Sequence, residues 1–593
     1  MRLAPYVAWI IAFVLVVGAD PAAWATAYLG REGDAAMTQL WLRDWLASGS
    51  PPAMLGFPWG LDPREYFDER VGVAVLTWPL RWCLGEPLGP NMLVVVGLAV
   101  NTWAIRVLAR ALGTTETVGW MVALPLTFNA TTVGAFQDSR PESGLIVFAC
   151  LGLARFLRGR TGPRDDMALL CWFSMASLVA GRVAFLVILA CACFAVVERE
   201  GRGRERLWQL AVLLPVVVVT PGLVVDTDNP FLPNPSGWSP WDWSGETAAN
   251  ADGLSSLDLG SRRVGTWHLG KEGELGFASG RRELMLTEML VFAAGYVLSQ
   301  TRATRLGLVF GGLGIFVATG PELAGMPNPG WIGLAKLVPL LRADRASLDA
   351  LLLWHIGAAA MSVGLWDSFG AYWRTRVATF CLVGFGWLGE VYATHAAPLD
   401  TWSPDVPEFY TCLAVAEAGA VLPLPPDRTA SQALYQTVHG RPVLAGLDGH
   451  VMSGLPAEGR SVLGENGFFL ALDAIVDGGS DDLSFEPADM QAVGELGFVW
   501  VVLDKRIMLR DGSLSERKAL KRIIAVGARL TDALGEPVYD DIDTTAWAPW
   551  GGESPCGRST SVEPDTTPMM DDIPEDMVIE EPGQRPQLGG GGG

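Results

Sequence analysis

The most constraining feature of this 593-residue chain is a series of apolar stretches, each 14 to 21 residues long, that recurs as far as residue 396. A helix that crosses a bilayer needs about 20 apolar residues. Only 18% of the residues are charged, against about 25% in an average soluble protein, which excludes a soluble globular enzyme. We therefore predict a mainly α polytopic bundle with about eleven spans: 5–18, 91–111, 117–136, 143–157, 167–181, 183–197, 207–226, 285–299, 305–319, 348–366 and 377–396.

Arginine residues orient this bundle, because basic residues gather on the cytoplasmic side of membrane proteins. They fall at alternate ends of the predicted spans, at Arg106, Arg110, Arg155, Arg158, Arg160, Arg164, Arg199, Arg202, Arg204, Arg206, Arg302, Arg305, Arg374 and Arg376. We expect the N-terminus inside, the C-terminus outside and the protein in the cytoplasmic (inner) membrane. The first stretch is also compatible with a cleaved signal peptide, but a multispan chain needs no cleavage, so we favour an anchor.

The chain beyond residue 400 differs from the bundle in charge and pattern. It holds 31 acidic and 13 basic residues, which is −18 of the net charge of −21. The segments 441–445 and 497–503 have the pattern of short buried strands, and 515–534 that of an amphipathic helix. We expect a bundle over 1–400 with outer loops 19–90 and 227–284, a small α/β extracytoplasmic domain over 401–550, which folds when expressed alone, and a disordered acidic Pro/Gly-rich tail over 551–593.

Sequence motifs and the cysteines limit the classes of reaction and partner that this chain can have. The chain has no Walker loop, HExxH or nucleophile-elbow motif, and its acidic balance argues against nucleic acid as a partner. Cys412 and Cys556 could pair if the C-terminal part lies in an oxidising compartment. His355, in the middle of a span, is expected to be a hydrogen-bonded packing residue. The helix at 71–84 contains Pro79 and Arg81 and is expected at the membrane surface.

Asp34 is the first candidate site residue. It precedes an apolar-periodic stretch in the first outer loop, where a carboxylate can cap the helix that follows. It can also serve as a general base that deprotonates an acceptor hydroxyl at the membrane surface. The two roles are compatible.

Two further clusters fall on the same outer face. Asp138, Arg140 and Glu142 occupy a short turn between two spans, where they either keep a hairpin in register or contribute to a binding site. Arg342 and Arg345 precede a late span, against the positive-inside trend. They either anchor the chain or bind a diphosphate, since guanidinium groups bind phosphate in bidentate fashion.

Several of these segments resemble bacterial multispan proteins of the GT-C glycosyltransferase superfamily that carry a C-terminal extracytoplasmic domain. The similar segments are GDAAMTQLWLRDWL at 33–46, PWGLDPREYFDERVGVAVLTWPL at 58–80, PLLRADRAS at 339–347, YQTVHGRPVLAG at 435–446 and LGFVWVVLDKRIM at 496–508. The resemblance implies transfer of a sugar from a polyprenyl-phosphate or polyprenyl-diphosphate donor to a glycan, lipid or protein acceptor. Asp34 would be the catalytic base, and Asp138 or Glu142 the second acidic position.

Two points stay open after this comparison. Clear members of the superfamily have an acidic pair at the base, but here Gly33 separates Glu32 from Asp34, so a divalent metal is not assigned as a cofactor. The competing class of function is a non-catalytic membrane scaffold or a transporter of lipid or polysaccharide. Transporters often contain two repeated halves with broken helices, and this sequence shows no such repeat.

Overall fold

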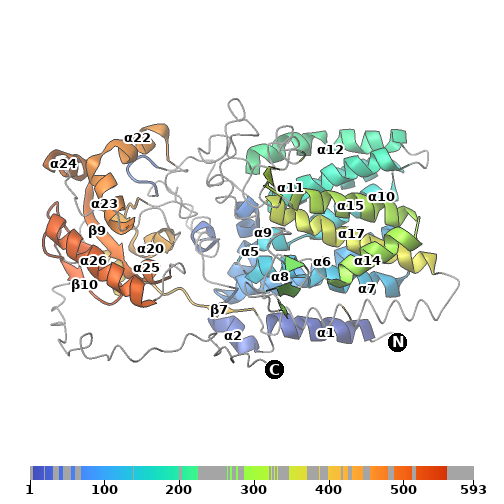
Figure 1. The fold of residues 1–593 in the computed structure, drawn as a ribbon, viewed down its shortest axis with the longest axis horizontal. Coiled ribbons are helices and arrows are strands. Elements are labelled where there is room, and N and C mark those ends of the chain that lie inside the picture. Colours follow the sequence, from blue (N-terminus) through green and yellow to red (C-terminus); the bar gives the residue numbers. More distant parts are fainter. Residues whose placement is uncertain are drawn as a thin grey trace, which may run out of the picture.

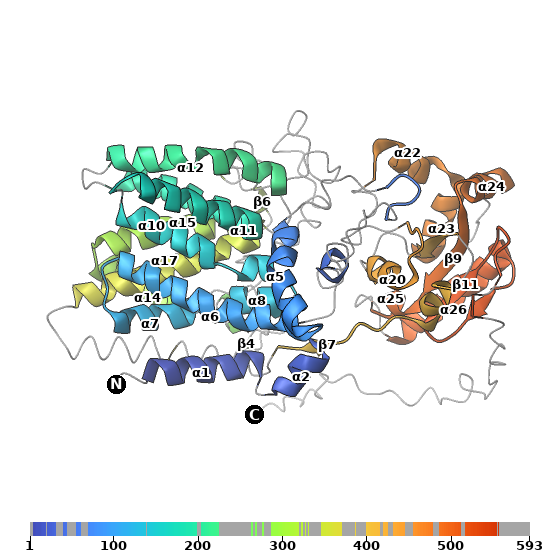
Figure 2. The same ribbon diagram turned by 180° about the vertical axis from the view of Figure 1, so that it is seen from behind.

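The chain folds into a helical bundle and a smaller α/β part that lie side by side (Figures 1 and 2). This computed structural model describes residues 4–18, 20–30, 39–43, 55–60, 69–137, 139–159, 161–198, 203–224, 263–264, 267–269, 275–277, 286–318, 322–323, 326–327, 330, 346–369, 386, 399–415, 419–424, 431–444, 455–477, 486–510, 516–553 and 555–556. The predicted tail over 551–593 falls almost wholly outside these residues, as does the predicted span at 377–396.

The bundle is built from helices that are apolar on most sides. Its helices are α1 (Ala4–Val17), α6 (Leu88–Ala111), α7 (Glu116–Thr127), α8 (Ala130–Gln137), α10 (Val147–Arg158), α11 (Pro163–Val197), α12 (Gly203–Val224), α14 (Leu286–Leu298), α15 (Arg302–Ala318) and α17 (Ala346–Ser368). Glycines let α15 and α17 approach closely, because a Cβ on Gly357 would lie 2.6 Å from the backbone nitrogen of Gly311. Such small-residue contacts are typical of helix packing in membranes.

Three of the described helices are long and apolar enough to cross a membrane, namely α6, α11 and α17 over Ala350–Ser368. Large apolar side chains are exposed on the outside of the bundle, for example Ile10 of α1, Trp103 of α6 and Val297 of α14. An exposed apolar surface of this kind needs an apolar environment. The protein is therefore mainly helical and contains helices that could span a membrane, but the described residues do not support the predicted count of eleven.

Helix α11 reverses direction within its 35 residues. Its backbone is non-helical at Ala180, one residue before the break that the sequence predicts at Gly181. Near the start of α11, Asp165 forms an ion pair with Arg155 of α10. Just past its end, Glu198 forms an ion pair with Arg206. Arg206 also donates a hydrogen bond to the carbonyl of Phe156 in α10. Both ends of α11 therefore lie beside the C-terminal end of α10, so the helix must turn back between them.

A surface helix covers the opposite end of the bundle. Helix α5 (Glu69–Leu84) runs across the ends of the bundle helices in Figure 2, and contains Pro79 as predicted. Its side chains Val75, Trp78 and Trp82 are exposed, with Trp82 at 83%. This is the expected pattern for a helix that lies in the membrane interface. The short helices α2 (Pro21–Thr26) and α9 (Pro141–Gly144) complete this end of the bundle.

The α/β part contains a four-stranded sheet with the order β10-β11-β9-β8. Strands β8 (Ala420–Leu424) and β9 (Phe498–Asp504) are parallel, whereas β11 (Thr544–Trp547) and β10 (Tyr539–Asp540) are antiparallel to their neighbours. The predicted strand at 497–503 is therefore confirmed. Among the described residues of the predicted strand at 441–445, Val443 alone pairs, through isolated bridges to Val421 and Leu55. Its helices are α19 (Glu408–Leu413), α20 (Ser431–His439), α22 (Ala457–Glu465), α23 (Gly467–Asp477), α24 (Pro487–Glu495), α25 (Lys505–Arg510) and α26 (Glu516–Leu534).

The first outer loop forms part of this C-terminal unit, which the sequence does not predict. Leu55 pairs with Val443 at the edge of the sheet, and the ring of Phe57 lies 5.3 Å from that of Phe498. Segment 55–60, blue in Figure 1, lies beside α22, where a Cβ on Gly459 would lie 2.8 Å from the indole of Trp59. The predicted domain over 401–550 is thus completed by residues from the N-terminal part of the chain.

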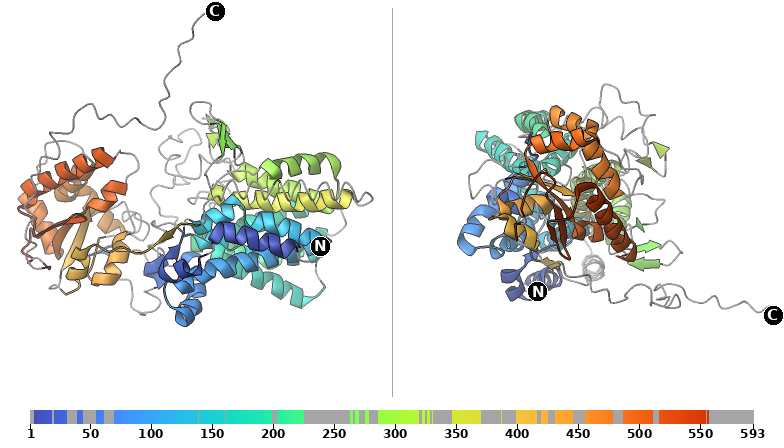
Figure 3. Two further views of the ribbon diagram at one scale, coloured as in Figure 1. Left: turned by 90° about the horizontal axis from the view of Figure 1, so that it is seen from below. Right: turned by 90° about the vertical axis from the view of Figure 1, so that its left-hand side faces the viewer.

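A disulfide extends the C-terminal unit past residue 550. Cys412 of α19 is bonded to Cys556, and their Cα atoms are 5.1 Å apart. This confirms the pairing that the sequence allowed. Shorter strands are β1 (Tyr28–Leu29) with β7 (Thr401–Trp402), β2 (Arg263–Val264) with β3 (Trp267–Leu269) and β4 (Leu275–Phe277), and β5 (Glu322–Leu323) with β6 (Met326–Pro327). The view from below in Figure 3 shows β7 between the two parts.

Candidate functional site

A cavity of about 50 Å³ lies where the end of the bundle meets the first outer loop and the linker to the α/β part. Five separate regions of the chain line it: β1, the short helix at 39–43, α5 and α6, the turn after α8, and β7. Its polar lining residues are Tyr28, Gln39, Arg43, Thr77, Asn91 and Ser139. Its other lining residues are Leu29, Val73, Pro90, Leu93, Val94, Phe136, Pro141 and Trp402.

Asn91 of α6 holds β1 against the bundle. Its side-chain oxygen accepts a hydrogen bond from the Leu29 amide at 2.8 Å, and its amide nitrogen donates to the carbonyls of Trp24 and Ala27, both at 2.7 Å. These bonds satisfy backbone groups that no regular secondary structure pairs. They fix the position of Tyr28 at the cavity.

Gly30 brings the first outer loop against the turn after α8. Its φ of +108° is in the region that glycine alone adopts readily, and a Cβ would lie 2.8 Å from both the Phe136 carbonyl oxygen and Ser139 Oγ. The Gly30 amide donates to the carbonyl of Asp400 at 2.8 Å. The loop, the turn and the linker to the α/β part therefore meet at this glycine.

Gln137 joins the same turn to the linker. Its amide nitrogen donates to the carboxylate of Asp400 at 2.5 Å, and its oxygen accepts from the Asp400 amide at 3.1 Å. This reciprocal pair connects the end of α8 to the residue just before β7. As a result, Trp402 of β7 is held against the ring of Tyr28, at a centroid distance of 5.2 Å.

Arg43 gives the cavity a buried positive charge. It is 6% exposed, its Nε donates to the Gln39 carbonyl at 3.0 Å, and its guanidinium lies 5.5 Å from the centre of the Tyr28 ring. Glu86 is 3.5 Å from Arg43 and 3.0 Å from Arg81. Burial, reinforced by the Glu86 carboxylate, raises the pKa of Tyr28 above its usual range.

The predicted site residues map onto this cavity only in part. Arg140 is half-buried directly after Ser139, and Glu142 lies in α9, with its side chain outside the described part of the chain. Asp34, Asp138, Arg342 and Arg345 also lie outside the described residues. The structure does bring together the two segments that contain the predicted residues, because the first outer loop and the turn at 137–142 line one cavity.

Three residues of the cavity were missed by the sequence analysis. Arg43 lies within an apolar stretch of an outer loop, and this exception to the positive-inside trend could have identified it. Tyr28 and Trp402 are 374 positions apart, and no local pattern indicates that β1 pairs with β7. Their contact depends on the tertiary fold alone.

A second polar cluster lies inside the bundle beside a cavity of about 20 Å³. Glu288 of α14 accepts a hydrogen bond from Trp354 Nε1, and its carboxylate is 2.8 Å from His355 Nδ1. The other ring nitrogen of His355, Nε2, is 3.0 Å from the hydroxyl of Thr131 in α8. Both Glu288 and His355 are buried. The hydrogen-bonded packing role predicted for His355 is therefore confirmed, and its partners join α8, α14 and α17.

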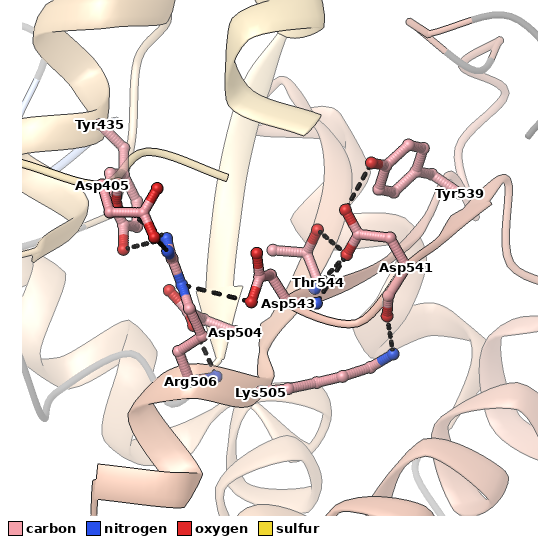
Figure 4. A network of polar contacts seen from close by, with 9 residues as sticks. All are labelled: Asp405, Tyr435, Asp504, Lys505, Arg506, Tyr539, Asp541, Asp543 and Thr544. Atoms are coloured by element: carbon pink, nitrogen blue, oxygen red, sulfur yellow. Dashed lines mark hydrogen bonds and ion pairs between the residues drawn. The ribbon is translucent and has the colours of Figure 1, made fainter. Parts of the chain in front are cut away.

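A third polar cluster belongs to the α/β part, drawn in Figure 4. Arg506 donates to the Asp405 carboxylate at 2.8 Å, to the Asp405 carbonyl at 3.0 Å and to the Tyr435 hydroxyl at 3.0 Å. Asp541 accepts from the Thr544 amide at 2.6 Å and caps the turn between β10 and β11. The Arg506 contacts fix the linker three residues after Trp402, so this cluster is structural and helps to position β7.

Neither a search for metal ligands nor a comparison with known proteins identifies a function for this site. Within the described ranges, no three His, Cys, Asp or Glu side chains are grouped so that they could hold a metal ion. The sequence matches no known family model, and no curated protein shows significant similarity to it. The functional interpretation therefore depends on the geometry of the chain itself.

Proposed function

We propose that this protein is a membrane glycosyltransferase of the GT-C type, which moves a sugar from a polyprenyl-phosphate-type donor at the outer face of the cytoplasmic membrane. The observation that carries the proposal is the cavity at the end of the bundle. The first outer loop, the turn at 137–142 and the linker of the C-terminal part all line it. An enzyme of this class needs an outer-loop carboxylate and cationic groups in one place beside the lipid phase.

The chemistry needs few groups. Asp34 removes the proton of the acceptor hydroxyl as its oxygen attacks the anomeric carbon of the sugar, and the bond from that carbon to the carrier's phosphate oxygen breaks. The leaving phosphate gains negative charge, which Arg342 and Arg345 stabilise. Asp138, Arg140 and Glu142 contact the substrate from the neighbouring turn. Transfer in one displacement inverts the configuration at the anomeric carbon.

The proposed orientation has the N-terminus inside and the cavity outside, with about eleven spans. The alternating arginine clusters favour this arrangement. The disulfide between Cys412 and Cys556 supports it further, since disulfides form and persist in oxidising compartments rather than in the cytoplasm.

Substitution of Asp34 by Asn tests the proposal. Asn keeps the size of the side chain and caps helices about as well as Asp, but it cannot accept the proton. Loss of general-base assistance lowers rates by about 10²–10⁴-fold, so Asp34→Asn should accumulate and unfold like the wild type while glycan production is abolished. The assay is complementation of a deletion strain with the variant, alongside membrane-level expression and thermal stability. Normal product from a normally folded variant would leave Asp34 as a cap only.

A lipid or polysaccharide transporter is the second candidate function. The observation in its favour is the buried Glu288–His355 pair, because ionisable residues inside a membrane bundle often mark transport or proton pathways. The Asp34→Asn experiment separates the two, since a transporter does not need a base in the first outer loop.

A further inference from the structure

The exposed face of helix α26 contains large apolar side chains. Leu520 is 40% exposed and Ile524, one turn later, is 62% exposed, and the exposed residues Ala525 and Ala528 extend the same face. Residues three or four apart are neighbours on a helix surface, so these side chains adjoin one another. Another face of the helix is buried in the core of the α/β part through Ile523, Val526 and Leu530. Single apolar residues are normal on a protein surface, whereas adjacent ones favour a binding surface.

Neither the bundle nor the lipid around it covers this face. Helix α26 lies on the side of the α/β part that is remote from the bundle (Figures 1 and 3). In the proposed orientation, that side points away from the membrane. The face must therefore be covered by chain outside the described residues or by another molecule.

Helix α26 is also a basic region in an acidic part of the chain. Residues 401–556 hold 23 acidic and 11 basic residues, and five of the basic residues are in α26. Arg522 and Arg529 already interact with other groups of the protein, so they do not count toward a binding surface. Residues 516–521 still contain three basic residues and one acidic residue, and the side chain of Lys521 is exposed. This face therefore favours a ligand that is both apolar and acidic.

The segment 569–581, MMDDIPEDMVIEE, has this composition. It contains six acidic residues, six apolar residues, one proline and no basic residue. A mixture of acidic and apolar residues is typical of short segments that bind an apolar and basic surface. The segment lies outside the described residues, so its sequence carries the comparison.

The attachment point of this segment places it within reach of α26. Cys556 is bonded to Cys412 and packs against the same core as the buried face of the helix. Twelve residues, 557–568, separate Cys556 from the segment. A chain of this length spans up to about 40 Å, which exceeds the diameter of a small domain, about 30 Å.

We propose that the segment 569–581 binds the exposed face of α26 within the same molecule. Its apolar side chains cover Leu520 and Ile524, and its carboxylates lie beside Lys521. A short linker gives an effective concentration on the order of 1 mM, so even a contact of low intrinsic affinity is well populated. The inference is independent of the proposed transferase, because no residue of the cavity takes part in it.

The test uses the full-length protein in detergent, a variant truncated after residue 560, and a fluorescent peptide of residues 565–584. The truncated variant keeps Cys556 and its disulfide. Fluorescence anisotropy should show that the peptide binds the truncated variant about tenfold or more tightly than the full-length protein, in which the chain's own segment competes for the face. A peptide with its acidic residues replaced by Asn and Gln should bind more weakly than the acidic peptide.

Substitutions in the truncated variant locate the contact. Ile524→Asp removes an apolar contact and places a carboxylate opposite the acidic peptide, so it should weaken binding about tenfold or more. Lys521→Gln removes an exposed positive charge and should weaken binding by about two- to fivefold. Val415→Asp, at a position after α19 that is 84% exposed, is the matched control and should bind like the parent. Thermal unfolding verifies that each variant is folded, as expected for substitutions at exposed positions.

Three results would overturn the inference. Equal peptide binding by the full-length and truncated proteins would show that the face is open to an acidic segment of another molecule. Equal binding by Ile524→Asp and its parent would place the contact elsewhere on the protein. Exclusion of the peptide only at concentrations where light scattering detects self-association would assign the segment to contacts between copies of the chain.

Discussion

The C-terminal part should not fold cooperatively without the first outer loop. Trp41, Leu42 and Leu55 are 3%, 1% and 0% exposed, and all three belong to the hydrophobic core that contains β8 and β9. Burial of a leucine stabilises by about 1.5–3 kcal/mol, and loss of a core tryptophan costs about 3–5 kcal/mol. Removal of segment 39–60 should therefore cost roughly 6–11 kcal/mol, which is comparable to the whole net stability of a domain, about 5–15 kcal/mol. This revises the expectation that 401–550 folds alone.

Two soluble fragments test this reasoning. The first contains residues 401–556, and the second adds residues 39–60 through a flexible Gly/Ser linker. Urea unfolding followed by circular dichroism should show a cooperative transition only for the second fragment. Substitution of Leu55 by Asp in the second fragment is the control, because it should abolish the gain by placing a charge in the core. A cooperative transition of similar midpoint in both fragments would refute the calculated contribution of the loop.

Three further predictions concern the same part of the molecule. Replacement of both Cys412 and Cys556 by Ser should lower the unfolding free energy of the α/β part by about 2–5 kcal/mol. Thermal unfolding with and without reductant measures this effect, and an unchanged midpoint would show that the disulfide does not stabilise the fold. Alkaline phosphatase fused after residue 400 should be active, since this enzyme folds only outside the cytoplasm. A fusion protein that accumulates but is enzymatically inactive would contradict the proposed orientation. Burial lowers the pKa of His439 from 6.5 to about 3, so below pH 6.5 the unfolded chain binds a proton that the folded chain rejects. Stability should fall by about 1.4 kcal/mol per pH unit as pH drops from 6.5 towards 3, and a His439→Gln variant that keeps this slope would contradict the assignment.

Local patterns were sufficient to predict a mainly helical chain, the helix at 515–534 and the main strand, but not the number of spans or most helices of the α/β part. The run of apolar residues at 497–503 became β9 because a buried central strand needs side chains that are apolar on both faces. Helix 515–534 became α26 because its charges fall on one side. The break near Gly181 was also visible, since an arginine interrupts a long apolar stretch. Each of these features depends on residues within about 20 positions of one another.

Contacts between distant segments could not be predicted in the same way. The pairing of Tyr28 with Trp402 and of Leu55 with Val443 involves two-residue strands or single bridges, whose hydrogen bonds leave no periodic pattern in the sequence. The candidate cavity is made almost entirely of such contacts. The sequence therefore indicated which loops belong to the outer face, but not that the C-terminal part contributes to the cavity.

The short helix at 39–43 explains why the two parts act together. Gln39 and Arg43, one turn apart, line the cavity, whereas Trp41 on another face donates to Gln436 of α20 at 3.0 Å and packs in the core of the α/β part. Residues four apart lie on the same side of a helix, and a residue two positions away points elsewhere, so this single turn has one face for each part. Any movement of α20 relative to the bundle must therefore either move Arg43 or break the Trp41–Gln436 hydrogen bond. The C-terminal part is consequently a structural determinant of the cavity, and its position fixes both Arg43 and Trp402.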